Sequence, residues 1–381
     1  MQKVVVGMSG GVDSSVAAYL LKEQGYDVIG VTMQIWQDED VCSISENGGC
    51  CGLGAVEDSR RVADVLDIPH YVMNFKKEFK ASVIDYFVSE YVSARTPNPC
   101  IACNRFVKWE ALLERSLSIG ASYIATGHYA SIVRLQNGRY AVKNSVTLEK
   151  DQTYALYNLT QFQLKHTLMP VGAYTKEEIR AIANKLKLPV ANKPDSQEIC
   201  FVTNNNYAEF IKEYLEDEDN RRIIEEKRAH YQKNKMSAEY GFAPGNFVDT
   251  KGNILGRHKG LAHYTIGQRK GLNIALGRPV FVKELKPDTN EVVLGDSEDV
   301  FTDRFYVGNI NFMSIEDLAD EMVVNTKIRY SHKGARCNIK RTAADRILCI
   351  FDEPQRAVTP GQAAVFYKDD YIVGGGTILS D

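Results

Sequence analysis

Cysteines are the residues of this chain best suited to chemistry, and six of the eight lie in the first 200 of its 381 residues. The chain begins with a strand-like stretch and has no signal-peptide architecture, so we expect it to remain in the cytoplasm, a reducing compartment. Stable disulfides are rare there, and clustered thiols indicate catalysis or metal binding. Cys337 and Cys349 lie in strand-like segments and are predicted to be buried. The six others occur in glycine-, proline- or polar-rich segments: Cys42, Cys50, Cys51, Cys100, Cys103 and Cys200.

Cys100 and Cys103 form a Cys-x-x-Cys pair in a segment that also contains Pro97 and Pro99. Two prolines this close disfavour regular helix and predict a stiff turn over residues 95–105. A thiol on a rigid turn suits a reactive group. The pair could also be half of a zinc site, but a closed zinc site needs four ligands and no second Cys-x-x-Cys follows. A thioredoxin-like site would need a small surrounding domain that the sequence does not indicate.

Residues 4–15 carry the strongest local signal for an anion site. A short β-branched run is followed by Ser-Gly-Gly-x-Asp-Ser-Ser and then by a predicted helix. Gly10 and Gly11 let backbone N–H groups come close to a phosphate, and the positive end of the helix dipole faces the same place. The loop lacks the lysine of a Walker A motif and the glycine spacing of a dinucleotide site. A glycine-rich turn with a good helix cap is the simpler alternative, but this loop is much more specific than a generic glycine pair.

This loop resembles the phosphate loop of the ATP-pyrophosphatase, or adenine nucleotide α-hydrolase-like, superfamily, whose members adenylate an oxygen and release pyrophosphate. The resemblance implies that ATP contacts the loop, that Asp13 helps to place Mg²⁺ on the phosphates, and that Met33 and Gly127 line the adenine pocket. Met33 and Gly127 lie where predicted strands end, the edge at which open α/β sheets bind ligands. The implied ATP-binding residues are Gly7, Met8, Ser9, Gly10, Gly11, Val12, Asp13, Ser14, Met33 and Gly127.

Further motifs occur in order along the chain at 96–104, 127–129, 151–154, 195–201, 260–271 and 360–362. Together with the phosphate loop they resemble the tRNA-specific 2-thiouridylase family over nearly the whole length. The resemblance implies ATP-dependent 2-thiolation of the wobble uridine in tRNA anticodons, in which the uracil C2 oxygen is adenylated and sulfur comes from a cysteine persulfide. It assigns Cys200 as the persulfide carrier and Cys103 as the nucleophile, with a transient Cys103–Cys200 disulfide afterwards. A cysteine desulfurase or a relay protein would donate the sulfur.

The same resemblance implies that Asn98, Pro99 and Cys100 contact the target base, which must leave the anticodon stack to reach the thiols. The other implied tRNA contacts are His128, Lys150, Asp151, Gln152, Arg329, Tyr330 and Gln362. Many family members carry Asp where Cys100 stands, so an acid–base role does not transfer to this position. Alternatively, Cys100, Cys103 and Cys200 would ligate an iron–sulfur cluster, as three cysteines do in related RNA thiolases. Residues 42–51 resemble an insertion, and we expect a glycine-rich surface loop there.

The elements that must position these residues alternate between strand and helix signals over the first 200 residues, which predicts an α/β architecture with a doubly wound parallel sheet. A charged helical stretch over 207–235 follows, and then short strands separated by Gly, Pro and Asn. We expect an ATP-pyrophosphatase catalytic domain over 1–205, a small β-rich domain with a helical insertion over 206–297, and a tRNA-contacting β-barrel over 298–381. No stretch of the sequence has the length and apolarity of a membrane helix.

The net charge of −3 argues against a uniformly basic RNA-binding surface, but 250–283 and 326–341 contain Lys and Arg without Asp or Glu. Either segment alone could be a solvated strand face. Another ATP-pyrophosphatase, such as an argininosuccinate synthetase or an amidotransferase synthetase domain, would not need Cys103, Cys200 or a basic β-rich tail. A non-enzymatic tRNA- or metal-binding module would not need the loop at 9–15.

Overall fold

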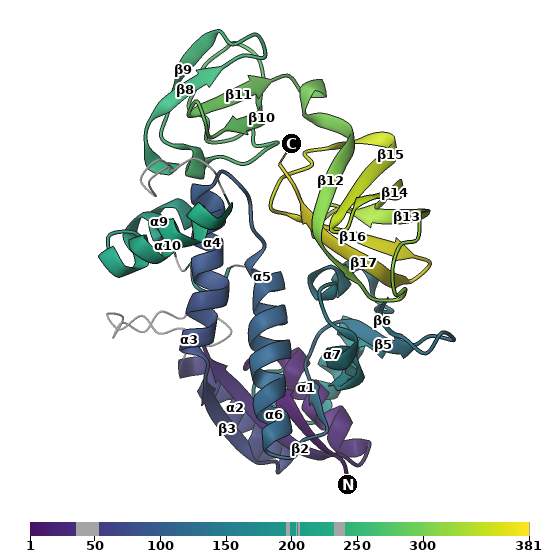
Figure 1. The fold of residues 1–381 in the computed structure, drawn as a ribbon. Coiled ribbons are helices and arrows are strands. Elements are labelled where there is room, and N and C mark those ends of the chain that lie inside the picture. The colour runs from purple at the N-terminus through teal and green to yellow at the C-terminus, as the bar shows by residue number, and fades with distance from the viewer. Residues whose placement is uncertain (36–52, 196–198, 203, 205, 232–240, 381) are drawn as a thin grey trace.

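The structure is a computed structural model that describes residues 1–35, 53–195, 199–202, 204, 206–231 and 241–380 (Figure 1). Cys42, Cys50 and Cys51 lie outside the described residues, as do parts of the segments 195–201 and 207–235. Within the described part of the chain, no helix combines the length and the apolarity needed to cross a membrane.

A five-stranded parallel sheet organises the N-terminal part, with the order β3-β2-β1-β4-β7. Its strands are β1 (Lys3–Gly7), β2 (Asp27–Gln34), β3 (His70–Asn74), β4 (Tyr123–Ala125) and β7 (Thr167–Leu168). Val5 packs into one hydrophobic cluster and Val4 and Val6 into another, as expected for a strand covered on both faces. The chain crosses from one side of β1 to the other between β3 and β4, so the carboxyl ends of β1 and β4 flank the crevice where such sheets bind ligands. The doubly wound parallel sheet is therefore confirmed.

Helices cover both faces of this sheet (Figure 1). One face packs against α1 (Val12–Glu23), α2 (Leu53–Leu66) and α8 (Lys176–Lys185). The other packs against two long composite helices, each with a π-helical centre. The first comprises α3 (Lys76–Phe79), η1 (Lys80–Ile84) and α4 (Asp85–Val92), and the second comprises α5 (Pro99–Ala102), η2 (Cys103–Leu112) and α6 (Leu113–Ser118). Shorter helices connect the elements: η3 (Leu148–Lys150), η4 (Thr153–Leu156), α7 (Gln161–Lys165), η5 (Pro170–Ala173), η7 (Leu261–His263) and η8 (Glu298–Val300).

The stiff turn predicted over residues 95–105 is wrong for its second half, because a helix begins at Pro99. Proline is tolerated at the first helical position, where an N–H group would have no partner inside the helix. Asn98 caps this helix, and its Oδ1 accepts hydrogen bonds from the N–H groups of Cys100 and Ile101 at 3.1 and 3.3 Å. Cys100 therefore lies in the first helical turn and Cys103 at the start of η2.

The charged helical stretch forms α9 (Tyr207–Tyr214) and α10 (Glu218–Tyr231), which pack beside α4 (Figure 1). Tyr207 stacks on Tyr91 of α4 with ring centroids 4.5 Å apart. A four-stranded sheet follows, in the order β10-β11-β8-β9, with a hydrophobic core of its own. Its strands are β8 (Gly245–Val248), β9 (Ile254–His258), β10 (Phe281–Lys286) and β11 (Glu291–Gly295).

Six antiparallel strands form the C-terminal barrel, which closes where β12 pairs with β17. They are β12 (Phe301–Phe312), β13 (Glu321–Lys327), β14 (Ala335–Ala343), β15 (Arg346–Arg356), β16 (Ala363–Lys368) and β17 (Tyr371–Ile378). Cys337 and Cys349 are buried in this barrel, as predicted.

A hairpin that the sequence did not predict, β5 (Ala130–Arg134) and β6 (Tyr140–Asn144), extends the barrel sheet through the pairing of Tyr371 with Lys143. Arg139 Nε also donates to the carbonyl of Met313 at 3.0 Å. The N-terminal part and the barrel are thus joined by backbone pairing and side-chain hydrogen bonds.

Candidate nucleotide and thiol site

The phosphate loop connects the end of β1 to the start of α1, as predicted. Gly10 has φ +67°, and a Cβ at this position would lie 2.8 Å from the backbone of Ala55, so glycine is required here. Within the described residues, the N–H groups of Gly11, Val12 and Asp13 have no hydrogen-bond acceptor. They are the unpaired donors of a helix amino terminus, so the loop can receive an anionic group.

The serine hydroxyl groups of the loop form hydrogen bonds within the loop itself. The Oγ atoms of Ser14 and Ser15 donate to the carbonyl of Gly11 at 3.2 and 2.8 Å. Ser14 Oγ also accepts from the N–H group of Ser9 at 3.2 Å. These bonds fix the shape of the loop. The donors that remain unpaired, and could bind a ligand, are backbone N–H groups.

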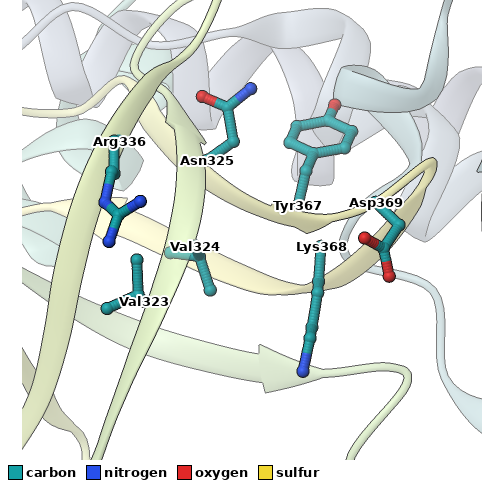
Figure 2. Close-up of a pocket in the computed structure, with 7 residues that line it drawn as sticks. All are labelled: Val323, Val324, Asn325, Arg336, Tyr367, Lys368 and Asp369. Atoms are coloured by element: carbon teal, nitrogen blue, oxygen red, sulfur yellow. The ribbon is translucent and has the colours of Figure 1, made fainter.

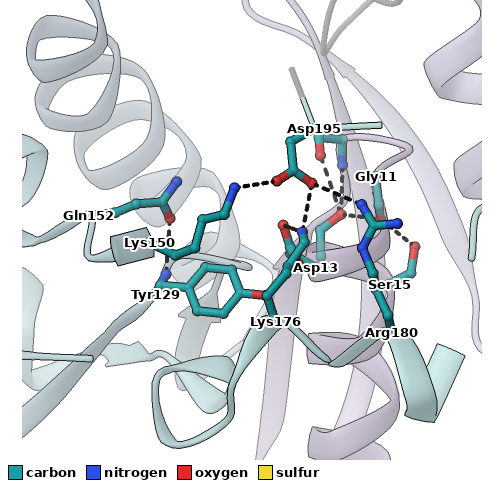
Figure 3. Close-up of polar contacts among 11 residues, drawn as sticks. Gly11, Asp13, Ser15, Tyr129, Lys150, Gln152, Lys176, Arg180 and Asp195 are labelled. Atoms are coloured by element: carbon teal, nitrogen blue, oxygen red, sulfur yellow. Dashed lines mark hydrogen bonds and ion pairs between the residues drawn. The ribbon is translucent and has the colours of Figure 1, made fainter. Parts of the chain in front are cut away.

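Asp13 lies at the centre of a charged network that the sequence did not predict (Figure 3). Lys176 Nζ contacts both carboxylate oxygens of Asp13, at 2.7 and 2.9 Å, and one oxygen of Asp195 at 2.7 Å. Tyr129 donates its hydroxyl to Asp13 Oδ1 at 2.8 Å, and Lys150 Nζ lies 3.0 Å from the other oxygen of Asp195. The phosphate loop is therefore linked to the segment that leads to Cys200.

The pKa values of this network follow its charges. Partial burial alone would raise the pKa of Asp195, but hydrogen bonds from Lys176 and Lys150 outweigh it and hold the pKa below its usual value. Burial, and then the negative charge of Asp13, raise the pKa of Tyr129 far above its ordinary value. Asp195 is thus ionised and Tyr129 is a stable proton donor at neutral pH.

Lys193 is a second lysine on the loop, since its Nζ donates to the carbonyl of Gly10 at 3.0 Å and lies 2.7 Å from Asp58. Lys193 lies two residues before the motif at 195–201, and this position was its only sequence signal. Lys176 gave none, because it follows an ordinary helix cap at Thr175. The fold alone brings Lys176 to Asp13.

The three candidate thiols lie on two segments. Cys100 is exposed, and Cys103 and Cys200 are partly buried against the same hydrophobic core. Beside Cys200, the ring of Phe201 makes edge contacts with Phe79 and Phe87 at centroid distances of 5.7 and 5.2 Å. These contacts hold the Cys200 segment against the first composite helix, next to the helix that carries Cys100 and Cys103.

Two chain connections limit how far these thiols lie from the phosphate loop. Cys200 is only five positions after Asp195 in the chain, so their Cα atoms are at most about 17 Å apart. Cys103 and Trp109 both lie on η2, and the centroid of the Trp109 ring lies 5.5 Å from that of the His128 ring. His128 follows Gly127, which packs on the first turn of α1. The thiol segments and the loop therefore belong to one region of the N-terminal part.

The side chains present can be compared with the ligands that a metal ion would need. Among the described residues, no group of three or more His, Cys, Asp or Glu side chains is close enough to hold a metal ion. Cys100, Cys103 and Cys200 thus form no site for a single metal ion among the described residues, and their ligation of an iron–sulfur cluster stays a prediction. Asp13 offers a carboxylate beside the loop N–H groups, a donor that suits Mg²⁺ already bound to phosphates.

The two predicted adenine-pocket residues flank β1, as the sequence implied. Met33 lies near the carboxyl end of β2, and Gly127 follows β4. A Cβ on Gly127 would come within 2.5 Å of the Ser14 backbone nitrogen, so this glycine permits close packing on α1. Both residues lie beside the crevice at the carboxyl ends of the strands.

Three predicted tRNA contacts in the N-terminal part also have structural roles. Lys150 pairs with Asp195, and Gln152 Oε1 accepts from the N–H group of Tyr129 at 2.9 Å. Asp151 is buried and accepts from the N–H group of Ser145 at 3.0 Å. His128 is half-buried, and burial, followed by the charge of Lys108, holds its pKa well below the usual value, so the ring is neutral.

The predicted tRNA contacts of the barrel surround the segment that precedes Asn98. Gln362 Nε2 donates to the carbonyls of Thr96 and Pro97 at 2.9 and 3.2 Å. Tyr330 is half exposed, and its pKa is raised by burial and then by the charges of Asp151 and Cys100, which places it near the thiol-bearing helix. The barrel thus contributes directly to the surroundings of Cys100.

A hollow of about 230 Å³ on the barrel is separate from these groups (Figure 2). Tyr367 and Lys368 point away from each other there, and the Tyr367 hydroxyl lies 3.1 Å from Thr153 Oγ1. The hollow is lined by Val323, Val324, Asn325, Arg336, Tyr367, Lys368 and Asp369. It contains no thiol or loop residue and is smaller than typical ligand pockets.

Three family models match the chain: the tRNA methyl transferase HUP domain over residues 2–204, the tRNA methyl transferase PRC-barrel domain over 233–296 and the aminomethyltransferase beta-barrel domain over 302–378. The tRNA-specific 2-thiouridylase MnmA of Lachnoclostridium phytofermentans is 66% identical over 379 residues, which cover 100% of both chains. The protein of the same name from Clostridioides difficile is 53% identical over 378 residues, or 99% of this chain and 98% of that one.

Among solved structures, a U34-tRNA thiolase from Methanococcus maripaludis with a 4Fe-4S cluster aligns at 17% identity and a TM-score of 0.34. The alignment covers 60% of this chain and 71% of that one, a similarity too low to transfer any property. The full-length relatives and the domain models, by contrast, are similar enough to assign the family. With a domain model over residues 2–204 and relatives at 53% and 66% identity over their whole length, the chain belongs to the tRNA-specific 2-thiouridylase family.

Proposed function

We propose that this chain, an enzyme of the tRNA sulfurtransferase class, uses ATP to convert the wobble uridine of tRNA anticodons into 2-thiouridine. The observation that carries the proposal is the Asp13–Lys176–Asp195 network, which joins the phosphate loop to the segment bearing Cys200. An ATP site and a sulfur carrier that are physically linked suit a reaction in which oxygen is activated and then replaced by sulfur. The full-length identity to named 2-thiouridylases supports the same substrate.

In the first step, the uracil C2 oxygen attacks the α-phosphorus of ATP, pyrophosphate leaves, and the oxygen becomes part of a good leaving group. The unpaired N–H groups of Gly11, Val12 and Asp13 would hold the phosphates. Mg²⁺ at Asp13 would neutralise phosphate charge. Lys176 Nζ, which contacts Asp13, would balance the negative charge of Asp13 after Mg²⁺ and the nucleotide leave. Met33 and Gly127 would border the adenine.

In the second step, the terminal sulfur of a Cys200 persulfide attacks C2 and AMP leaves with the former oxygen. The Cys103 thiolate then attacks the Cys200 Sγ, which forms the Cys103–Cys200 disulfide and leaves the terminal sulfur on the base. A dithiol reductant must restore both thiols, and a sulfur donor protein, a cysteine desulfurase or a relay protein, must recharge Cys200. Both demands suit a protein that works in the cytoplasm.

We propose that the three parts of the chain divide this work, with catalysis in 1–205 and RNA contacts shared with 206–297 and 298–381. Asn98, Pro99 and Cys100 would meet the flipped uridine at the start of α5. Lys150, Asp151, Gln152 and His128 would reach the RNA from the N-terminal part, and Arg329, Tyr330 and Gln362 from the barrel.

The adenylation step is tested with purified protein and ATP labelled at the α-phosphate. We expect AMP release that depends on a tRNA with a wobble uridine. AMP release that is equally fast without tRNA would contradict the substrate assignment and favour another ATP-pyrophosphatase reaction.

The sulfur carrier is tested with Cys200→Ser and with Cys337→Ala, a barrel thiol, as the control. We expect Cys200→Ser to thiolate tRNA when free sulfide is supplied, but not when a persulfide donor protein is the sulfur source. Cys337→Ala should thiolate with both. Normal activity of Cys200→Ser with both sources would show that the carrier is another residue.

A further inference from the structure

A pocket of about 370 Å³ lies where the N-terminal part, the central domain and the barrel meet. Its size falls in the range of small-ligand pockets. Thr96 contributes from the segment before α5, and Thr265 Oγ1 lies 3.3 Å from Thr96 Oγ1. The barrel contributes Arg329, Arg356 and Gln362. The pocket therefore exists only when all three parts are assembled.

Two arginines give this pocket its charge. Arg329 Nη1 donates to the carbonyl of Arg356 at 2.9 Å, and Arg356 Nη1 donates to Ser297 Oγ at 3.0 Å. The guanidinium of Arg356 also lies over the ring of Phe281, 4.4 Å from its centroid. Within the described part of the chain, neither arginine has a carboxylate at ion-pair distance. Two oriented guanidinium groups without acidic partners form a site for an anion.

We infer that this pocket binds a backbone phosphate of the substrate RNA near the target uridine, with Arg356 as a phosphate-binding residue beside Arg329. The inference deepens the proposed function and rests on it for the identity of the RNA. Thr96 precedes Cys100 by four residues, so the pocket lies within about 14 Å of the thiol-bearing helix turn measured along the chain. Tyr330, the neighbour of Arg329, lies near Cys100. An RNA strand that presents its base to α5 would thus pass over the two arginines.

The test compares Arg356→Gln and Arg356→Ala with Arg346→Ala. Arg346 is the matched control because it begins the strand that Arg356 ends and also stacks on a ring, that of Tyr306, at 3.9 Å from the centroid. We expect both Arg356 variants to bind tRNA about tenfold more weakly, with a salt slope of log Kd reduced by about 0.8, the value for one lost phosphate contact. Arg346→Ala should match the wild type. Thermal unfolding checks that each variant is folded, and Arg356→Gln keeps a donor for Ser297 if truncation to alanine disturbs the junction.

A second measurement locates the phosphate. Anticodon-arm RNAs carrying one neutral methylphosphonate at successive positions should include one that weakens binding to the wild type but not to Arg356→Gln.

An unchanged salt slope, or equal losses in the Arg346 and Arg356 variants, would overturn the inference. Loss of activity only with the protein sulfur donor, with RNA binding intact, would also overturn it and assign the pocket to that donor. If the wild type binds RNA as described but never thiolates it, the proposed function fails and the phosphate site stands.

Discussion

At the scale of single residues, the site depends on how well separate segments of chain converge. The phosphate loop could be predicted because its glycines, serines and Asp13 are contiguous and their chemistry is local. The contacts of Lys176, Lys193 and Tyr129 with that loop could not be predicted, because only the folded sheet brings these side chains to it. Lys176 is the most consequential of these, since it is 7% exposed and contacts two carboxylates.

We predict that Lys176→Ala raises the KM for ATP about tenfold and lowers the free energy of unfolding by about 2 kcal/mol, since Asp13 and Asp195 would lose their shared cation. Steady-state kinetics and urea denaturation measure both effects. The control is Lys143→Ala, which removes an exposed pair with Asp370 and should change stability by about 0.5 kcal/mol or less. An unchanged KM would exclude a role for Lys176 at the nucleotide.

At the scale of elements, the helix predicted directly after the phosphate loop is confirmed as α1, because glycines and residue periodicity are local signals. The start of α5 was mispredicted, since Pro99 at the first helical position looks the same in sequence as Pro99 in a turn. The β5–β6 hairpin was missed although Asn137-Gly138 in its turn is a local hairpin signal, and only its attachment to β17 is non-local. The π-helical centres at η1 and η2 depend on packing that a single sequence does not reveal.

Helix α8 offers a prediction about how an element positions a side chain. Thr175 and Glu178 form a capping box at its amino terminus, directly before Lys176. Thr175→Ala should lower the free energy of unfolding by about 1 kcal/mol and raise the KM for ATP, because the first turn would fray.

The matched control for this prediction is Thr160→Ala, which removes the same capping box from α7. It should cost similar stability and leave the KM for ATP unchanged. Equal kinetic effects of the two variants would mean that the α8 cap has no special role in placing Lys176.

At the scale of the whole molecule, five histidines among the described residues have a pKa below the ordinary value, and they are distributed over all three parts. Burial is the first cause of the lowered pKa for each of them: His70, His128, His258, His263 and His332. In the unfolded chain these rings take up protons below about pH 6.5, whereas the folded chain keeps them neutral to lower pH. Stability must therefore fall as the pH decreases through that window.

We predict that the Tm is about 2–6 °C lower at pH 5.5 than at pH 7.5, and nearly constant between pH 7.5 and 8.5. Differential scanning calorimetry in buffers of equal ionic strength measures it. Asp195 does not offset the loss, because its lowered pKa gives stability that is retained until the pH falls below about 3.8. A Tm that rises on acidification to pH 5.5 would contradict the assignment of buried neutral imidazoles.

The seam between the barrel and the segment before α5 has a consequence for protein engineering. The N–H group of Thr96 donates to the carbonyl of Pro360 at 2.9 Å, and Gly361, at φ +89°, leaves no room for a Cβ against Thr96. The barrel loop therefore sets where the thiol-bearing helix begins. A chimera that took its barrel from a distant homologue would have to import residues 95–97 with it, or its parts would fold correctly and still misplace the sulfur chemistry.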